Sequence, residues 1–459
     1  MEVKSSRKKI VGWIVTLALV LLVAVIPTTE VYTTQIKIFM MITVAGIMSL
    51  VFELLIPTVP AILMPCLYVI TGLVDTATAF KGWTGEVVWC SFACFLIANM
   101  LTRTGLLKRI ANKCIIITGA SYTGIIFGIF IGGIVLSIIS GGSTSMTFAY
   151  IAFGYGVCQA LGLKKSRASA GIMISSCVSM MMSSNFIYTP ASYGVMFGAV
   201  GESLARPTYM EFLMQNWILI PLNFIVAFIV AKTMKPEVPI NGKEYFVSEQ
   251  KALGKMSSDE WKMVVMLVII LAMLLLEKQI GINYMYAFLA VPFLFFLPGL
   301  NVGKFEDIKN IKFETVVFVA GFMSVGTVAR SVGIADLVTT VVVPLLTSSN
   351  VWIIIAIFWL IGFLINFLLT PLAAMTALSA PIASIATNLG FNPTAILYAF
   401  AHGLDNLLMP YERSIYLACY GYDMIDLKYF AKVMGYKAIA GFIYIMVICV
   451  PYWKLIGLL

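Results

Sequence analysis

Apolar runs of about 20 residues recur from one end of this 459-residue chain to the other. A helix of that length crosses a hydrocarbon core of roughly 30 Å and satisfies its own backbone hydrogen bonds in lipid. Only 11% of the residues are charged, whereas a soluble protein carries about a quarter. The sequence therefore predicts an all-α polytopic membrane protein.

We expect about 11 transmembrane helices, together with two helical hairpins that re-enter the membrane and an inverted internal repeat. Scaffold helices are expected at 1–75, and the first repeat follows at 76–231. After a cytoplasmic linker at 232–260 come further scaffold helices and an amphipathic connector at 261–313, and then the second repeat at 314–459. Each repeat should contain one hairpin, at 114–160 and 338–390, and one unwound helix, at 168–200 and 394–420.

Basic residues are concentrated in short segments between the apolar runs. These segments hold 23 of the 30 Lys and Arg residues, and they are the N-terminus, 103–113, 164–167, 232–262, 304–312 and 428–437. They fall on one side of the membrane when the spans are counted, as the positive-inside rule requires. The net charge of +9 then needs no nucleic-acid partner. We expect a multi-pass protein of the cell membrane, with its N-terminus cytoplasmic and its C-terminus outside.

Two pairs of similar stretches indicate the repeat. The stretch that begins at Glu86, EVVWCSFACFLIANMLTRTG, resembles the one that begins at Glu314, ETVVFVAGFMSVGTVARSVG. Likewise SSNFIYTPASYGVMFGAVG (183–201) resembles HGLDNLLMPYERSIYLACYG (402–421). Counting the spans makes Glu86 open an inward span and Glu314 an outward one. Inverted repeats with helices broken at matching positions indicate a secondary transporter with its site at the membrane midplane.

The first interruption, SIISGGSTSMT at 137–147, places glycines and hydroxyls where a membrane helix would carry hydrocarbon. Glycine permits a tight turn and lets a ligand approach the backbone, and a helix that restarts there directs N–H groups at an anion. The alternative is close helix packing through small residues. The expected substrate-binding residues are Ser140, Gly141, Gly142, Ser143 and Thr144, and Ser140 and Ser145 are expected to contact a coupling ion.

The second interruption lies at 366–376, where Pro371 breaks the helix. Thr370, Pro371 and Thr376 are expected to bind substrate, and Asn366 to contact the coupling ion. The alternative is a proline kink whose hydroxyls bond to their own helix.

Polar residues and prolines also interrupt the two helices that follow the hairpins. Ser184, Asn185, Thr189 and Pro190 in the first, and Asn406 and Pro410 in the second, are expected to bind substrate.

Asp405 is the best candidate for a cation ligand or proton carrier, because an ionisable group at this depth is costly and usually functional. The alternative is charge neutralisation by Arg330 or Arg413. Glu412 and Arg413 could form a structural pair, and His402 is more typical of a packing residue than of a proton shuttle.

The sequence shows no pattern for a metal centre, a prosthetic cofactor or an enzyme. The eight cysteines form no Cys-x-x-Cys pair, there is a single histidine, and no hydrolase elbow or phosphate loop is present.

The stretches FLIANMLTRTGLLKRIA (95–111) and ALSAPIASIATNLGFNP (377–393), with the order of span, hairpin and unwound helix, resemble the divalent-anion/sodium symporter family. The resemblance covers roughly residues 40–459 and implies a homodimer. Members carry Ser-Asn-Thr at each hairpin tip, which binds carboxylates and helps to hold sodium. Only Ser140 matches, since Gly141 and Gly142 follow it and the second tip falls on Pro371, Leu372 and Ala373, or one residue earlier. The family's Thr-Pro pair is present as Thr189 and Pro190, with Met409 and Pro410 as its counterpart.

The expected function is secondary active transport of a small anion, most of all a di- or tricarboxylate, by alternating access. A sodium or proton gradient, or exchange for another anion, would supply the energy. Two alternatives stay open: a cation/proton antiporter or inorganic oxyanion transporter of the same superfamily, and an anion channel. The partners expected are the anionic substrate, the lipid bilayer and a second copy of the chain.

Overall fold

The computed structural model describes the chain except residues 1, 53, 57, 143, 202–203, 282, 312, 335–336, 338–349 and 368–369. It also leaves the side chains of residues 2–8, 50, 51, 86, 87, 191, 284, 285, 315, 330, 411 and 414 undescribed. The described residues form helices joined by short connections and contain no β-strand. The predicted all-α fold class is confirmed.

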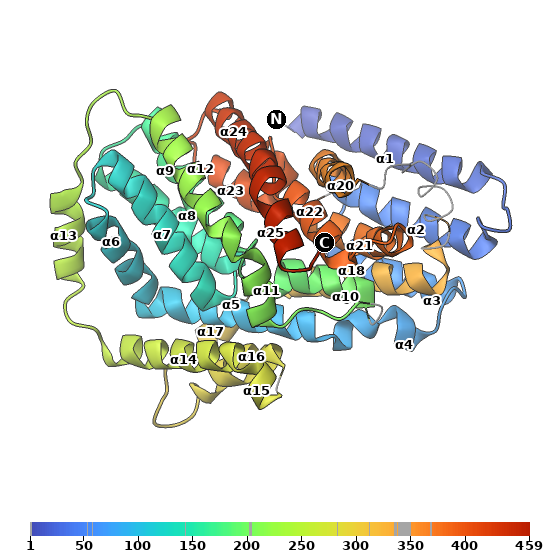
Figure 1. Ribbon diagram of the computed structural model, residues 1–459, viewed down its shortest axis with the longest axis horizontal. Helices are drawn as coiled ribbons and strands as arrows, with labels where there is room; N and C mark the ends of the chain where they lie inside the picture. Colours follow the sequence, from blue (N-terminus) through green and yellow to red (C-terminus); the bar gives the residue numbers. More distant parts are fainter. Residues whose placement is uncertain are drawn as a thin grey trace.

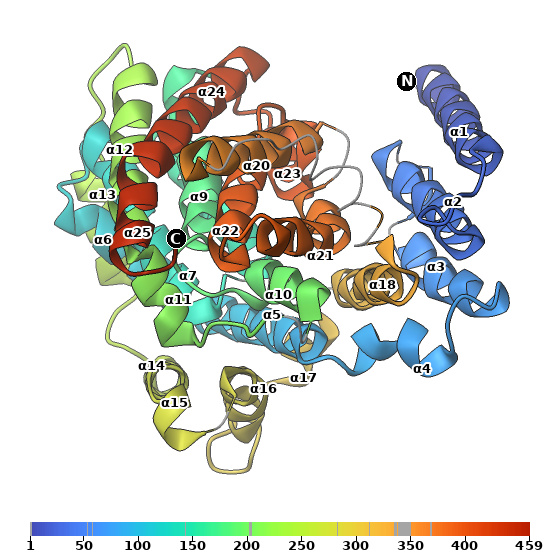
Figure 2. The ribbon, with the colours of Figure 1, turned by 45° about the vertical axis from the view of Figure 1, so that its right-hand side comes forward.

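Three helices at the N-terminus lie along one side of the molecule (Figures 1 and 2). They are α1 (Glu2–Val25), α2 (Thr34–Val51) and α3 (Thr58–Ile70). These helices pack in sequence order, and α3 then packs against α18 (Phe313–Ser331). The close approach of α3 and α18 depends on Gly321, because a Cβ atom there would overlap the carbonyl oxygen of Ala61.

The residues expected to form the first repeat fold into a set of helices that begins with two short turns. They are α4 (Thr76–Ala79), η1 (Lys81–Thr84), α5 (Glu86–Thr104), α6 (Leu106–Ile117), α7 (Tyr122–Ser140), α8 (Thr144–Ala160), α9 (Arg167–Ser183), η2 (Pro190–Gly194), α10 (Val195–Val200), α11 (Tyr209–Asn216), η4 (Trp217–Leu219) and α12 (Ile220–Thr233).

The second half of the chain begins with helices that pack beside α5 and then repeats the order of the first. They are α13 (Lys243–Ala252), α14 (Ser258–Leu275), α15 (Glu277–Ile280), α16 (Tyr284–Leu294), α17 (Phe305–Lys309), α18, α20 (Val351–Ile365), α21 (Pro371–Asn388), α22 (Pro393–Leu404), η6 (Pro410–Glu412), α23 (Ser414–Gly421), α24 (Leu427–Tyr444), η7 (Ile445–Cys449) and α25 (Val450–Leu455).

The helix order of 86–233 recurs in 313–455. A 19-residue helix, α5 or α18, comes first. The pair α7–α8 or α20–α21 follows, then the broken helix α9–η2–α10 or α22–η6–α23. The last member is α11–η4–α12 or α24–η7–α25. This order supports the predicted internal repeat.

The first hairpin is shorter than the sequence predicts. Residues 114–117 belong to α6, which meets α5 at an angle of 73°. The bend is made at Gly105, whose φ of 86° is open to glycine at little cost. Because α6 buries Leu106, Ala111 and Ile115 and exposes its lysines, it is an amphipathic helix, and the hairpin itself spans 122–160.

Both helix breaks coincide with the polar stretches of the sequence. Helix α9 ends at Ser183 and the chain returns to helical turns at Pro190, while α22 ends at Leu404 and turns resume at Pro410. Proline suits the first position of a helical turn, where its fixed φ fits and its missing N–H is not needed.

The helices vary widely in length. By length and composition, three helices within the described residues could each cross a membrane: Tyr122–Ser140, Tyr209–Thr233 and Leu427–Leu455. The bent pair α5–α6 would make a fourth, and five further apolar helices have 10–17 residues. The predicted number of spans therefore stays a prediction.

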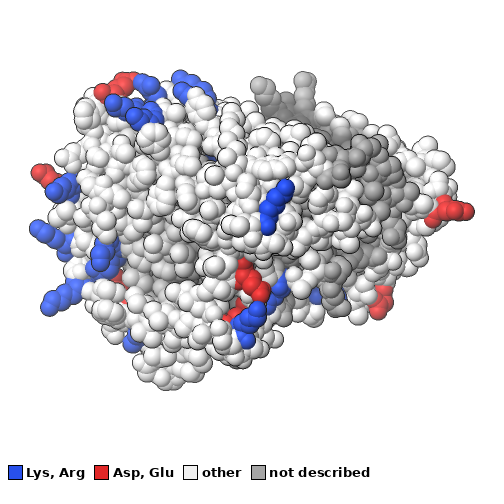
Figure 3. Space-filling view, viewed as in Figure 1, with Lys and Arg blue, Asp and Glu red and all other residues white. Residues whose placement is uncertain are grey.

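Lys and Arg side chains gather at one end of the molecule, over α6 and α13 (Figure 3). Lys108, Lys113, Lys243 and Lys251 are exposed there. Part of the expected linker is thus a helix, and Phe246 of α13 is fully buried. This end of the molecule is therefore basic.

Helices α20 and α22 pack closely against each other. A Cβ atom at Gly362 would overlap the carbonyl oxygen of Phe400, and one at Gly403 would overlap that of Trp359. The two glycines therefore let the two backbones touch, and α22 is held where its C-terminal end meets the second hairpin.

We predict that Gly362→Ala lowers the thermal unfolding midpoint of the purified protein. The added methyl group must separate two backbones, and overpacking of this kind costs about 1–3 kcal/mol. Gly156→Ala in α8 is the control, because nothing lies within 4 Å of a Cβ atom there and alanine favours helix. Equal midpoints for the two variants would contradict the close contact between α20 and α22.

Candidate functional site

The two hairpin tips and the two helix breaks meet through side-chain contacts in the interior of the molecule. Helix α21 packs against both α10 and α22 there (Figure 2). The contacts run from the first tip to the first break, from there to the second break, and on to the second tip.

The first tip is a glycine turn that presses on the first break. Gly141 and Gly142 have φ of 62° and 68°, a region that other residues enter at a cost. A Cβ atom at Gly142 would overlap Cγ2 of Thr189. Ser140 Oγ and Thr189 Oγ1 are buried and have no hydrogen-bond partner among the described residues. Because such groups are normally paired, they are available to a ligand.

The two breaks are joined by Asn185 and Asp405. Asn185 Nδ2 donates to Asp405 Oδ2 at 3.1 Å, and Tyr193 Oη donates to Asn185 Oδ1 at 3.3 Å. Both Asn185 and Asp405 are 7% exposed. The sequence places these residues in separate repeats, and the structure brings them into direct contact.

The second tip is tied to the second break by Asn366. Its Nδ2 lies 3.1 Å from the carbonyl oxygen of Leu404, 3.4 Å from that of Asn406 and 3.5 Å from that of Gly403. Carbonyl groups at the end of a helix lack intrahelical donors, so this amide satisfies the end of α22. Its Oδ1 has no partner among the described residues.

Asp405 forms an ion pair that the sequence reading misses. Lys437 of α24 lies 2.9 Å from Asp405 Oδ2 and 2.6 Å from the Asp405 carbonyl oxygen, and it is 2% exposed. The sequence analysis counts Lys437 among the basic residues that fall on one side of the membrane. In the structure its side chain is buried, ten residues after the start of α24. Its position inside that helix is the signal that could have revealed it.

Arg413 shares Asp405 with Lys437, whereas Glu412 and His402 have other partners. Arg413 contacts Asp405 Oδ1 at 3.7 Å, so the expected neutralisation involves Arg413 as well as Lys437. Glu412 accepts from the backbone N–H groups of Met409 (2.7 Å) and Leu408 (3.3 Å) and is buried. Instead of pairing with Arg413, it stabilises the turn. His402 stacks on Trp453 with ring centroids 6.5 Å apart.

Several of the expected ligands use their hydroxyls locally. Ser184 donates to the carbonyl oxygen of Met181 at 2.6 Å, and Thr376 donates to that of Ala373 at 2.8 Å. Thr370 is exposed and caps α21 by accepting from the Ala373 N–H at 3.4 Å. Thr376 thus follows the alternative in which the hydroxyl bonds to its own helix.

The remaining expected residues lie at the ends of helices. Thr144 opens α8, Pro190 opens η2, Pro371 opens α21 and Pro410 opens η6. Asn406 donates to the carbonyl oxygen of His402 at 2.6 Å. Ser143 lies outside the described residues.

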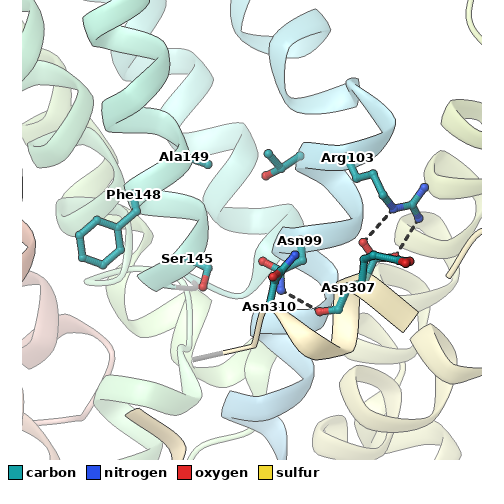
Figure 4. Close-up of a pocket in the computed structure, with 9 residues that line it drawn as sticks. Asn99, Arg103, Ser145, Phe148, Ala149, Asp307 and Asn310 are labelled. Carbon is teal, nitrogen blue, oxygen red and sulfur yellow. Dashed lines mark hydrogen bonds and ion pairs between the residues drawn. The ribbon is translucent and has the colours of Figure 1, made fainter. Parts of the chain in front are cut away.

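A cavity of about 340 Å³ opens beside the first tip (Figure 4). Ser145, in the first turn of α8, lines it together with Asn99 and Arg103 of α5 and Asp307 of α17. Arg103 Nε and a second guanidinium nitrogen each donate to Asp307 at 2.8 Å. Asn99 Nδ2 donates to the Asp307 carbonyl oxygen at 2.8 Å. The cavity is therefore polar, and it is bounded by an ion pair.

These features define a helical membrane transporter whose apolar helices surround polar, broken segments. Residues 7–459 match the sodium:sulfate symporter transmembrane region, and the chain belongs to that family of transporters. It is therefore a multi-pass membrane protein and not an enzyme, as predicted.

Two relatives and one solved structure are similar to most of the chain. A membrane protein of Cupriavidus necator is 23% identical over 401 residues, covering 83% of this chain and 77% of the relative. Dicarboxylate transporter 1, chloroplastic, of Arabidopsis thaliana is 21% identical over 413 residues, covering 85% and 73%. The YdaH transporter of Alcanivorax borkumensis shares the fold, with a TM-score of 0.56, 15% identity, and coverage of 85% and 89%.

We predict that Asp405→Asn destabilises the protein, because it leaves the buried ammonium of Lys437 without its carboxylate. Removing one partner of a buried pair costs about 3–5 kcal/mol, whereas replacing both by neutral groups can be nearly neutral. Thermal unfolding should therefore fall strongly for D405N and recover in D405N/K437M. If D405N unfolds at the same midpoint as wild type, the Asp405–Lys437 ion pair does not stabilise the fold.

Proposed function

We propose that the chain is a secondary active transporter that binds a small anion where the two hairpin tips and the two helix breaks meet. Three contacts carry this proposal: the first tip against the first break (Gly142 and Thr189), the first break to the second (Asn185 and Asp405), and the second tip to the end of α22 (Asn366 and Leu404). Broken helices of two repeats that meet at one point are the arrangement that transporters use for substrate and coupling ion.

Helix ends supply the attraction for an anion. Helices α8 and α21 begin at the two tips, and the first N–H groups of a helix are unpaired and carry a partial positive charge. Arg413 adds a guanidinium whose contact with Asp405, at 3.7 Å, is longer than a hydrogen bond. Its remaining donors suit the two oxygens of a carboxylate. We propose that Arg413 and the two helix N-termini bind the substrate.

Two classes of cargo are favoured by specific observations. A di- or tricarboxylate is supported by the likeness to a relative named as a dicarboxylate transporter. Sulfate, an inorganic oxyanion, is supported by the description of the family. Both are small anions whose oxygen atoms fit the guanidinium group of Arg413. We propose the carboxylate first because of the likeness to that relative.

The fit to sodium differs between the two halves. In the first half, Ser140 Oγ and Thr189 Oγ1 are buried oxygens without partners among the described residues, and they could contact a cation together with backbone carbonyl groups. In the second half, the oxygens of Asp405 already contact Lys437. We propose that a coupling cation, sodium or a proton, binds with the first half, and that Asp405 acts as the electrostatic partner of Lys437.

The polar cavity beside Ser145 is proposed as the route to the cytoplasmic end. It lies between the first turn of α8 and α17, on the side of the molecule where α6 and α13 carry their exposed lysines. Alternating access would close this route and open another on the opposite side. The homodimer and the orientation of the termini stay predictions.

One screen tests cargo and coupling ion together. Purified protein is heated with succinate, citrate or sulfate, in sodium chloride or potassium chloride, because a ligand that binds only the folded state raises its stability. We expect a carboxylate to raise the unfolding midpoint, and to do so more in sodium if sodium is the coupling ion. The same anion should accumulate in liposomes against its gradient under an imposed cation gradient.

Stabilisation by sulfate alone would replace the carboxylate with the oxyanion. Uptake that only equilibrates the anion would favour a channel, and proton flux without anion movement would favour a cation/proton antiporter. Neither stabilisation nor uptake with any anion would contradict the proposed function.

We predict that Gly142→Ala weakens binding of the stabilising anion at least about tenfold, or 1.4 kcal/mol, because the methyl group overlaps Thr189 at the site. Gly162→Ala is the matched control. Gly162 has nearly the same φ, 64°, but nothing lies within 4 Å of its Cβ position, so both variants carry the same backbone strain. The midpoint shift as a function of anion concentration measures the affinity. Equal affinities in the two variants would place the ligand elsewhere.

A further inference from the structure

The Lys437 ammonium is enclosed by three oxygen atoms. They are the Asp405 carbonyl oxygen at 2.6 Å, Asp405 Oδ2 at 2.9 Å and Asn406 Oδ1 at 3.3 Å. An ammonium group has three N–H donors and no acceptor, so this set uses all three. The side chain is 2% exposed. All three N–H donors of Lys437 are therefore used at the second helix break.

These oxygens form the kind of set that binds a cation. Asp405 is the C-terminal cap of α22, and the end of a helix carries partial negative charge and unpaired carbonyl groups. Unwound carbonyl groups and helix C-terminal ends coordinate the coupling cations of broken-helix transporters. A carboxylate and an amide oxygen complete the set. The geometry is that of a cation site in which the cation is part of the chain.

The first half of the molecule has no equivalent cation. Asn185 lies 220 residues before Asp405 and carries no charge, and its side chain is taken by Asp405 and Tyr193. The segment 209–233, which forms the counterpart of α24–η7–α25, contains one basic residue, Lys232, which is exposed in the last turn of α12. The two halves therefore share a helix order but differ in charge at corresponding positions.

We infer that Lys437 is a tethered cation that takes the place of a mobile coupling ion in the second half of the site. This inference rests on the proposed function, because Lys437 can replace a coupling ion only if the protein is a transporter. The second half then needs no ion from solution, and coupling to a gradient is left to the first half. A purely structural ion pair would show the same contacts. In that case, however, a free cation would not restore the stability that is lost when the lysine side chain is removed.

The test removes the ammonium and offers free cations in its place. Thermal unfolding of purified Lys437→Ala, without substrate, is measured in sodium chloride, methylammonium chloride and choline chloride at equal ionic strength. We expect sodium or methylammonium to raise the midpoint above that in choline by about 3 °C or more beyond the increment of the control. Choline is too large for the vacated position.

Two controls accompany this variant. Lys432→Ala removes an exposed lysine from the same helix, α24, and should show the sodium increment of wild type. The double variant D405N/K437A lacks the carboxylate as well, so its sodium increment should fall back to that of the control.

Three results would overturn the inference. The first is a K437A increment no larger than that of K432A. The second is an increment that persists in D405N/K437A, because sodium would then bind elsewhere. The third is failure to recover folded K437A from membranes purified in sodium or methylammonium. The readout needs neither substrate nor transport, so failure of wild type to accumulate any anion would count against the proposed function alone.

Discussion

The need to satisfy backbone groups where two helices stop inside an apolar molecule governs the rest of this structure. A helix end leaves carbonyl and N–H groups without partners, and in a membrane no solvent replaces them at low cost. At the second break, three side chains bond to these backbone groups or to the residues that carry them. Asn366 donates to the carbonyl groups at the end of α22, Lys437 donates to Asp405, and Glu412 accepts from the turn that follows.

The same requirement explains why the site is formed by several segments of the chain and not by one sequence motif. Each break is satisfied in part by residues that lie far away in the sequence, so the hairpin, the broken helix and α24 must be in place together. Asn185 and Asp405 carry this dependence across the two halves. Ser140 Oγ and Thr189 Oγ1, which have no hydrogen-bond partner among the described residues, lie on the first tip and the first break, which are in contact.

Ion pairs at the basic end connect the first repeat to the helices that follow the linker. Arg103 of α5 binds Asp307 of α17, and Arg109 of α6 binds Glu260 of α14 at 2.6 Å. Both carboxylates are buried while the guanidinium groups are partly exposed. Any movement of the first repeat against α14 and α17 must therefore break these pairs or carry their partners along. The polar cavity at Arg103 and Ser145 lies on that boundary.

The sequence by itself determined the helical membrane class, the repeated order, the two tips and the two breaks. Glycine, proline and runs of hydroxyl residues interrupt a helix wherever they occur, because their effect on the backbone is local. Only the tertiary structure decided which polar groups remain free. Thr376 and Ser184 bond locally, whereas Lys437, which the sequence groups with the basic segment 428–437, lies buried against Asp405. A side chain's partner depends on which helices pack against it, and those helices can be distant in the sequence, as Asn185 and Asp405, 220 residues apart, show.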